Sequence, residues 1–159
     1  MTYFVLVGAG GGVSAKIVLA ARVTLEGFAS FARLLSGEYS LRKAAKLILE
    51  MGPKYLIIKK GEHGALLFHE DNVFSAPALP LEEVFDPTGA GDTFAGGFVG
   101  YLSKCNEINW ENMKSAIIIG SAMASFTVEK FGIDRLVEVQ EEEIKSRIEA
   151  FKTLTTFSL

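Results

Sequence analysis

Apolar and polar residues recur along this chain with two periods, one typical of strands and the other of helices. Short apolar or alternating runs predict strands. We expect these strands at residues 3–7, 55–59, 65–68, 73–75 and 83–85. Elsewhere apolar residues return every three or four positions, which is the spacing of a helix with one buried face. We expect these helices at residues 13–25, 28–35, 41–51, 90–103, 110–130 and 140–151.

The alternation of strands and helices indicates an α/β fold, in which helices flank a parallel or mixed sheet. Capping residues support the borders of the helices. Ser40 and Asn109 are good N-caps, and Gly52 with Pro53 ends the helix that precedes them. A chain of 159 residues has the size of one domain. We therefore expect a single α/β domain over residues 1–159.

The composition argues against several classes of partner. The net charge is −3 and no basic block is present, so we do not expect nucleic acid binding. No stretch reaches the length of a membrane-spanning helix, and the apolar N-terminus lacks a positive leader, so we expect neither a membrane partner nor a signal peptide. The single cysteine, Cys105, cannot form an internal disulfide, which fits the reducing cytoplasm.

The stretch from Asp86 to Phe98, DPTGAGDTFAGGF, carries the strongest chemical signal. Gly89, Ala90 and Gly91 are small enough for the backbone to curl tightly, so that successive N–H groups point into one space. The helix that begins there adds N–H groups and the positive end of its dipole, which suits a phosphate or a developing phosphoryl charge. Asp92 stands beside this place and can accept a proton from an attacking hydroxyl. Together these features predict phosphoryl transfer to an alcohol.

These residues resemble the C-terminal signature of the ribokinase-like (PfkB) family of sugar and nucleoside kinases. The segments LLSG at 34–37, GPKYLIIKKGEHGA at 52–65 and GSAMASFTVE at 120–129 follow the family's order of elements. The resemblance covers about residues 32–152, and the strand, loop and helix context around the signature makes it specific. It implies part of a ribokinase-like fold and phosphotransfer from ATP, with Mg²⁺, to a hydroxyl of a sugar or nucleoside.

The resemblance also assigns roles to residues of the signature. Asp92 would be the general base. The N–H groups of Gly89, Ala90 and Gly91 would stabilise charge on the transferred phosphoryl group. The structural alternative for Asp92 is a helix-start residue favoured by the dipole, and the alternative for the small residues is a simple tight turn.

Other residues would contact the nucleotide. By resemblance, the loop that contains Gly61 and Gly64 would lie near ATP, with Lys59 just before it. By itself this loop is a hairpin turn with two glycines. Ser121 and Ala124 lie where the family's long helix borders the adenine, although small residues also suit close helix packing.

Two candidate metal sites differ in their support. Asp86 and Thr88 resemble positions that line a site for a monovalent cation such as K⁺. An aspartate before a proline is equally a turn initiator, so both interpretations stay open. His63 and His69 are not expected to bind a metal, because they lie at opposite ends of a predicted strand with no third ligand nearby.

The chain departs from the family in two ways. It lacks the N-terminal half that supplies sugar-binding residues and a lid, and the family's Asn-x-x-Glu motif, which helps to place Mg²⁺, is replaced by FASF at 28–31. Residues 1–31 are atypical. We therefore expect impaired activity in this short form. Two alternatives are a non-catalytic nucleotide-binding remnant and an assembly module that forms a homo-oligomer through an exposed sheet edge or apolar surface.

A second glycine run, GAGGGVS at 8–14, follows the first predicted strand and precedes a predicted helix. This context is similar to a dinucleotide-binding fingerprint. The spacing fails because Val13 stands where the third glycine is required, and no acidic residue follows at the right distance. We expect a structural turn here rather than the NAD site of an oxidoreductase.

Overall fold

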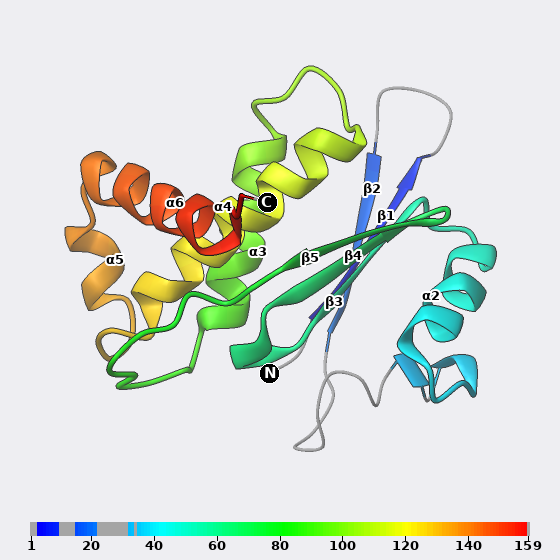
Figure 1. The fold of residues 1–159 in the computed structure, drawn as a ribbon, viewed down its shortest axis with the longest axis horizontal. Coiled ribbons are helices and arrows are strands. Elements are labelled where there is room, and N and C mark those ends of the chain that lie inside the picture. Colours follow the sequence, from blue (N-terminus) through cyan, green and yellow to red (C-terminus); the bar gives the residue numbers. More distant parts are fainter. Residues whose placement is uncertain (1–2, 10–14, 22–31, 34, 159) are drawn as a thin grey trace. The chain divides into compact units, whose positions relative to one another are not determined.

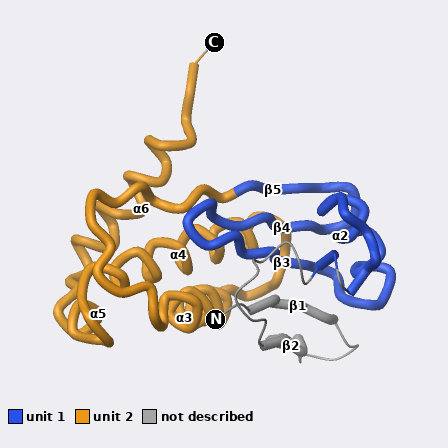
Figure 2. Tube along the Cα trace, turned by 90° about the horizontal axis from the view of Figure 1, so that it is seen from below, with its two compact units in different colours: residues 1–75 blue, residues 76–159 orange. Residues whose placement is uncertain are grey.

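The computed structural model describes residues 3–9, 15–21, 32–33 and 35–158, and it describes side chains in the last two of these ranges (Figure 1). The chain divides into two compact units, residues 1–75 and residues 76–159 (Figure 2). The single domain predicted from the chain length stays a prediction, because the compactness of each unit does not show whether the two fold together.

The first unit is built on a five-stranded sheet with the strand order β2-β1-β3-β4-β5. β1 pairs with both β2 and β3, and β3 pairs with β4, in each case antiparallel. The last residue of β5 already belongs to the second unit. The strands are β1 (Tyr3–Ala9), β2 (Ala15–Ala21), β3 (Tyr55–Lys59), β4 (Ala65–His69) and β5 (Asn72–Ala76).

Short connections explain why neighbouring strands run in opposite directions. β3 and β4 are joined through the 3₁₀ turn η1 (Gly61–His63), and only Glu70 and Asp71 separate β4 from β5. Connections of this length form hairpins, whereas parallel strands need a crossover of a dozen or more residues. The α/β class is confirmed. The strand pairs whose direction the structure describes are antiparallel, where a parallel or mixed sheet was expected.

β2 replaces the helix predicted over residues 13–25. Ile17 and Leu19 suggested helical spacing, but residues two apart also match the period of a strand. Pairing decides between the two, since Leu19 lies opposite Val5 and Ile17 opposite Val7 in the ladder with β1. The glycine run is thus followed by a strand and not by the helix of a dinucleotide site. Residues 10–14 of that run, and most of the helix predicted over 28–35, lie outside the described residues.

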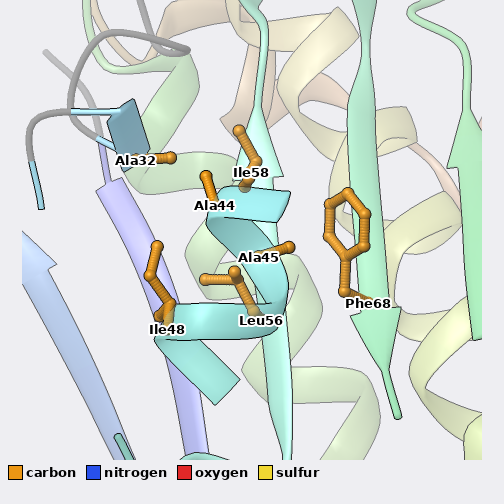
Figure 3. Close-up of a cluster of buried hydrophobic side chains, with 7 residues drawn as sticks. All are labelled: Ala32, Ala44, Ala45, Ile48, Leu56, Ile58 and Phe68. Carbon is orange, nitrogen blue, oxygen red and sulfur yellow. The ribbon is translucent and has the colours of Figure 1, made fainter. Parts of the chain in front are cut away.

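One helix, α2 (Leu41–Glu50), covers a face of the sheet beside β3 (Figure 3). It begins after Ser40, as predicted, although the Ser40 side chain makes no capping hydrogen bond. Leu56 and Ile58 are two apart in β3 and therefore point to the same face. The buried cluster on this face consists of Ala32, Ala44, Ala45, Ile48, Leu56, Ile58 and Phe68.

The second unit is helical. It contains α3 (Ala90–Leu102), α4 (Trp110–Thr127), α5 (Asp134–Glu138) and α6 (Glu141–Thr155). α3 and α4 pack along each other at glycines. A Cβ at Gly120 would lie 2.7 Å from the Phe94 carbonyl oxygen, and one at Gly97 would lie 3.2 Å from the Gly120 Cα. The buried side chains of this unit include Phe94, Phe98, Leu102, Met113, Ile117, Phe126 and Phe151.

The three long helices of this unit begin within one residue of their predicted starts. The short helix α5 was not predicted from the sequence. The strand predicted over residues 83–85 is wrong, because this segment is irregular and exposed. None of the helices in the described part of the chain is long and apolar enough to cross a membrane.

Candidate active site

The signature forms a bend that leads directly into α3. Gly89 is the N-cap of this helix and has a φ of 82°, in the left-handed region that favours glycine. Before the bend, the Thr88 N–H donates to the Asp86 Oδ1 at 2.9 Å, which makes a turn of the kind predicted for an aspartate followed by proline. After the bend, the Thr93 N–H donates to the Gly89 carbonyl at 2.9 Å and closes the first helical turn.

The loop before the bend is anchored to the end of α4. The Val128 carbonyl accepts hydrogen bonds from the Phe85 N–H at 2.8 Å and from the Asp86 N–H at 3.4 Å. A Cβ at Gly89 would lie 3.8 Å from the methyl group of Thr127. Phe85 and Gly89, the two ends of this loop, therefore lie beside the last turn of α4, and the Phe85 N–H pairs with the end of this helix instead of with a strand.

Asp92 is the third residue of α3 and its side chain is exposed. Within the part of the chain that the structure describes, this side chain has no hydrogen bond or ion pair. The carboxylate is therefore accessible from solvent beside the positive end of the helix dipole. The Asp92 side chain does not point into the interior. A purely structural carboxylate that caps buried groups would point there.

The backbone donors at the bend are partly occupied. The Ala90 N–H donates to the Pro87 carbonyl at 3.3 Å, longer than the usual range of about 2.7–3.2 Å. Gly91 also takes part in an interaction within the protein. Binding of an anion by the N–H groups of residues 89–92 accordingly stays a prediction.

Oxygen atoms are the donors available for a cation near this bend. Hydrogen bonds from the amide and the hydroxyl of Thr88 lower the pKa of Asp86, so its carboxylate stays charged under ordinary conditions. Thr127 is buried, and its hydroxyl oxygen has no hydrogen-bond partner among the described residues. Oxygen ligands suit hard cations such as K⁺ and Mg²⁺. No group of three His, Cys, Asp or Glu side chains suited to a metal occurs among the described residues.

The predicted nucleotide residues are divided between the two units. Ser121 and Ala124 are half-buried in α4 and belong to the same unit as the signature. Lys59 is the buried last residue of β3. Gly61 is the first residue of η1 and Gly64 follows its last residue, with φ values of 59° and 81°. These three belong to the first unit, so their relation to Asp92 stays a prediction.

A charged cluster that the sequence did not reveal lies at the end of α4. Glu129 accepts from Arg135 Nε at 2.8 Å and from Arg147 at 2.5 Å. Arg135 also pairs with Glu143, and Arg147 donates to the Ser125 hydroxyl at 3.0 Å. Burial raises the pKa of Glu129, but the hydrogen bonds and charges of the two guanidinium groups lower it further, so the net shift is downward. Charge pairs separated by 18 positions carry no periodic signal in a sequence.

A profile of the pfkB family carbohydrate kinases matches residues 24–139, which is more than half of the chain. The chain belongs to the pfkB family. The resemblance carried by the signature is thereby confirmed. The matched region of this pfkB chain begins at residue 24, upstream of the predicted border at 32, and ends at residue 139, before the predicted border at about 152.

Curated relatives of the pfkB chain are kinases of nucleosides and sugars. A cytidine kinase from Thermococcus kodakarensis is 35% identical over 94 residues, which are 54% of this chain and 34% of the relative. A ribokinase from Staphylococcus aureus is 33% identical over 116 residues, which are 70% of this chain and 36% of the relative. The aligned region thus spans about a third of the length of these relatives.

Solved structures share the fold of this pfkB chain. Ribokinase from Thermotoga maritima has a TM-score of 0.61 at 29% identity, covering 77% of this chain and 39% of its own. Aminoimidazole riboside kinase from Salmonella enterica, complexed with aminoimidazole riboside and an ATP analogue, has a TM-score of 0.62 at 29% identity, covering 76% and 40%. The predicted partial ribokinase-like fold is confirmed.

Proposed function

We propose that this chain is the catalytic part of a kinase that transfers the γ-phosphoryl group of ATP to a hydroxyl of a sugar or nucleoside. One observation carries the proposal. Asp92 presents an accessible carboxylate in the first turn of α3, immediately after the left-handed bend at Gly89. A base beside a helix N-terminus is the arrangement that transfer of an anionic group to an alcohol requires.

In this reaction Asp92 accepts the proton of the acceptor hydroxyl as the acceptor oxygen attacks the γ-phosphorus of ATP. A new P–O bond forms, the bond between the β,γ-bridging oxygen and the γ-phosphorus breaks, and ADP leaves. The protonated Asp92 then returns its proton to water. Because Asp92 has no hydrogen bond or ion pair within the described part of the chain, it can change its charge without disrupting a salt bridge there.

The backbone of the bend supplies electrostatic stabilisation in this proposal. The N–H groups of Gly89, Ala90 and Gly91 face the transferred group, and the long hydrogen bond from Ala90 to Pro87 is weak enough to be exchanged for a phosphoryl oxygen. Bound Mg²⁺ supplies charge neutralisation on the phosphate oxygens. The carboxylate of Asp86 and the hydroxyl of Thr88 are the oxygen donors that we assign to a monovalent cation such as K⁺.

The nucleotide and the acceptor are assigned on different grounds. An ATP analogue is bound in the related aminoimidazole riboside kinase, which supports ATP as donor. We place Lys59, Gly61, Gly64, Ser121 and Ala124 at the nucleotide by resemblance. The aligned region spans about a third of the length of these curated relatives. We propose that the residues which select the acceptor lie outside the aligned region. The activity of this chain alone is therefore impaired.

The direct test is Asp92→Asn, which keeps the volume of the side chain and removes the base. We expect phosphotransfer to fall by about 10²–10⁴-fold, because proton acceptance is lost while the bend is unchanged. The measurement is a coupled ADP-release assay over a panel of sugars and nucleosides. Calorimetry with Mg²⁺ and ATP reports binding separately, and we expect the two proteins to bind within about threefold of each other.

Asp134→Asn is the matched control, because Asp134 is also an exposed carboxylate in a first helical turn, that of α5. It should leave both turnover and binding unchanged. Retention of turnover in Asp92→Asn would show that another group is the base. Binding of ATP without turnover on every acceptor would favour the non-catalytic remnant.

Exposed apolar side chains favour a second candidate function, an assembly module that forms a homo-oligomer. Phe131, Ile133 and Val137 lie close together in sequence in the second unit and are 68%, 67% and 73% exposed. Such side chains suit a contact with another copy of the chain. A monodisperse monomer in light scattering would count against this candidate.

A cytoplasmic location of the kinase stays part of the proposal.

A further inference from the structure

We propose that Glu129 is a positioning residue, which keeps the Val128 carbonyl in the place where it holds the loop that leads to Asp92. The catalytic consequence rests on the function proposed above. The positioning itself is a statement about the structure of the loop and can be tested without any turnover.

The Glu129 carboxylate is fixed from two sides. Arg135 comes from α5 and Arg147 from α6, and each donates to a different oxygen of the same carboxylate. The side chains of Glu129, Arg135 and Arg147 are only 25%, 17% and 16% exposed. Solvent therefore screens these pairs less than it screens an ordinary surface pair, and each pair orders the groups it joins.

The aromatic ring of Phe126 orders the same two arginines. The guanidinium carbon of Arg147 lies 4.0 Å from the ring centroid and that of Arg135 lies 5.1 Å from it, within the range of a cation–π contact. The ring itself is fully buried. Phe126 and Glu129 are therefore both fixed, and Val128 lies between them in the chain.

One atom, the Val128 carbonyl oxygen, connects Glu129 and its arginines to the signature. The Val128 carbonyl oxygen accepts the N–H groups of both Phe85 and Asp86, which are the only backbone hydrogen bonds described between this loop and α4. Asp86 then makes the turn with Thr88 that precedes the bend at Gly89. A shift of the Val128 carbonyl would move Asp86 and, four residues later, the start of α3 at Ala90.

Ordinary pairs in this unit do not act in this way. Glu149 pairs with Lys152 on the exposed side of α6, and both side chains are 66% exposed. This pair connects two residues of one helix. It therefore provides a control that removes a carboxylate charge and an ion pair, as Glu129→Gln does, without an effect on Val128.

The test is amide hydrogen exchange in the whole chain, measured by NMR for the wild type, Glu129→Gln and Glu149→Gln. We expect Glu129→Gln to accelerate exchange of the Phe85 and Asp86 amides about 10-fold. The variant loses the charge-assisted hydrogen bonds that hold residue 129, which is next to Val128, the acceptor of these two amides. Exchange of the Phe98 amide inside α3 should change less than about twofold. Glu149→Gln should change none of these amides.

Arg147→Lys provides a second variant in which the charge is kept. A lysine retains the aliphatic stem over Phe126 but cannot donate to Ser125 and Glu129 with the fixed geometry of a guanidinium. We expect acceleration of the Phe85 and Asp86 amides between that of the wild type and that of Glu129→Gln. Unchanged exchange at these two amides in Glu129→Gln, or equal acceleration at Phe98, would overturn the proposal, because the role would then be absent or merely global.

Activity separates this inference from the proposed function. If the wild type transfers phosphate, Glu129→Gln should lower kcat more than it raises KM for ATP, since the loop positions Asp92 and the N–H groups at the transferred phosphoryl group, whereas we assign the rest of the nucleotide to other residues. If the wild type transfers no phosphate to any acceptor, the proposed function fails. The exchange of Phe85 and Asp86 then still decides whether Glu129 positions the loop.

Discussion

In the first unit, apolar side chains pack a helix against a sheet. In the second unit, glycines let two helices approach each other closely, and ion pairs hold the end of one of these helices. α2 contributes Ala44, Ala45 and Ile48 to a cluster with residues of β3 and β4. α3 and α4 instead meet where Gly97 and Gly120 remove the Cβ atoms that would separate them. The end of α4 is then fixed by the pairs of Glu129 with two arginines.

This difference between the units indicates which contacts need a precise geometry. An apolar cluster tolerates exchange of side chains of similar volume, because its energy depends mainly on the area removed from water. A glycine contact and a charged pair each have one acceptable geometry. The unit that carries the signature uses both, so the placement of Asp92 depends on contacts that tolerate little change.

The largest effect is expected for Gly120→Ala. The new Cβ would lie 2.7 Å from the Phe94 carbonyl oxygen, and a backbone atom cannot move aside cheaply. Overpacking costs about 1–3 kcal/mol, partly offset by the better helix propensity of alanine. We expect a lower free energy of unfolding in urea, followed by the fluorescence of the single tryptophan, Trp110 in α4.

Gly100→Ala is the control for this prediction. Gly100 lies in α3, and no atom lies within 4 Å of a Cβ built there. The same gain in helix propensity should therefore stabilise the chain by about 0.5–1 kcal/mol. Equal stability of the two variants would show that the close approach of α3 and α4 has no energetic weight.

An intermediate effect is expected at the two predicted N-caps, one in each unit. The Asn109 Oδ1 accepts the Asn112 N–H at 2.9 Å, whereas Ser40 makes no such bond before α2. Asn109→Ala should cost about 1 kcal/mol, and Ser40→Ala should cost less than half of that. Urea unfolding followed by circular dichroism measures both. A larger loss for Ser40→Ala would reverse the contrast between the units.

The smallest effect is a change with pH that depends on Glu129. Its pKa in the folded chain lies below the ordinary value of 4.5. The group therefore contributes stability that is fully present above that value and is lost as the pH falls through the lower, folded pKa. The unfolding midpoints of wild type and Glu129→Gln should differ most near neutral pH and converge as the pH falls below 4.5 and through the lower, folded pKa. A difference that grows in acid would contradict the direction of the pKa shift.

Local signals explain which parts of the fold could be predicted. The starts of α3, α4 and α6 follow from caps and apolar spacing, which are properties of neighbouring residues. β2 was mistaken for a helix because the short apolar run around Ile17 and Leu19 fits both periods, and only the pairing with β1 distinguishes them. The short connections through η1 and through Glu70 and Asp71 favour antiparallel neighbours, whereas the alternation of strands and helices favours a parallel or mixed sheet.

The candidate site divides in the same way. The Gly89 bend and the exposed Asp92 were predictable because a motif of adjacent residues specifies them. The anchoring of Phe85 and Asp86 on the Val128 carbonyl was not, since it joins residues more than 40 positions apart. The roles of Lys59, Gly61 and Gly64 remain predictions that need the nucleotide to be observed in place.

The border between the two units has a practical meaning for anyone who wishes to separate them. It falls between Ser75 and Ala76, inside β5, and Ala76 is fully buried. Cleavage at the border would therefore cut β5. One fragment would keep a shortened β5, and the other would begin with Ala76 removed from its strand. A dissection that begins at the exposed Pro80 would keep β5 whole and would still retain every residue from the signature onward.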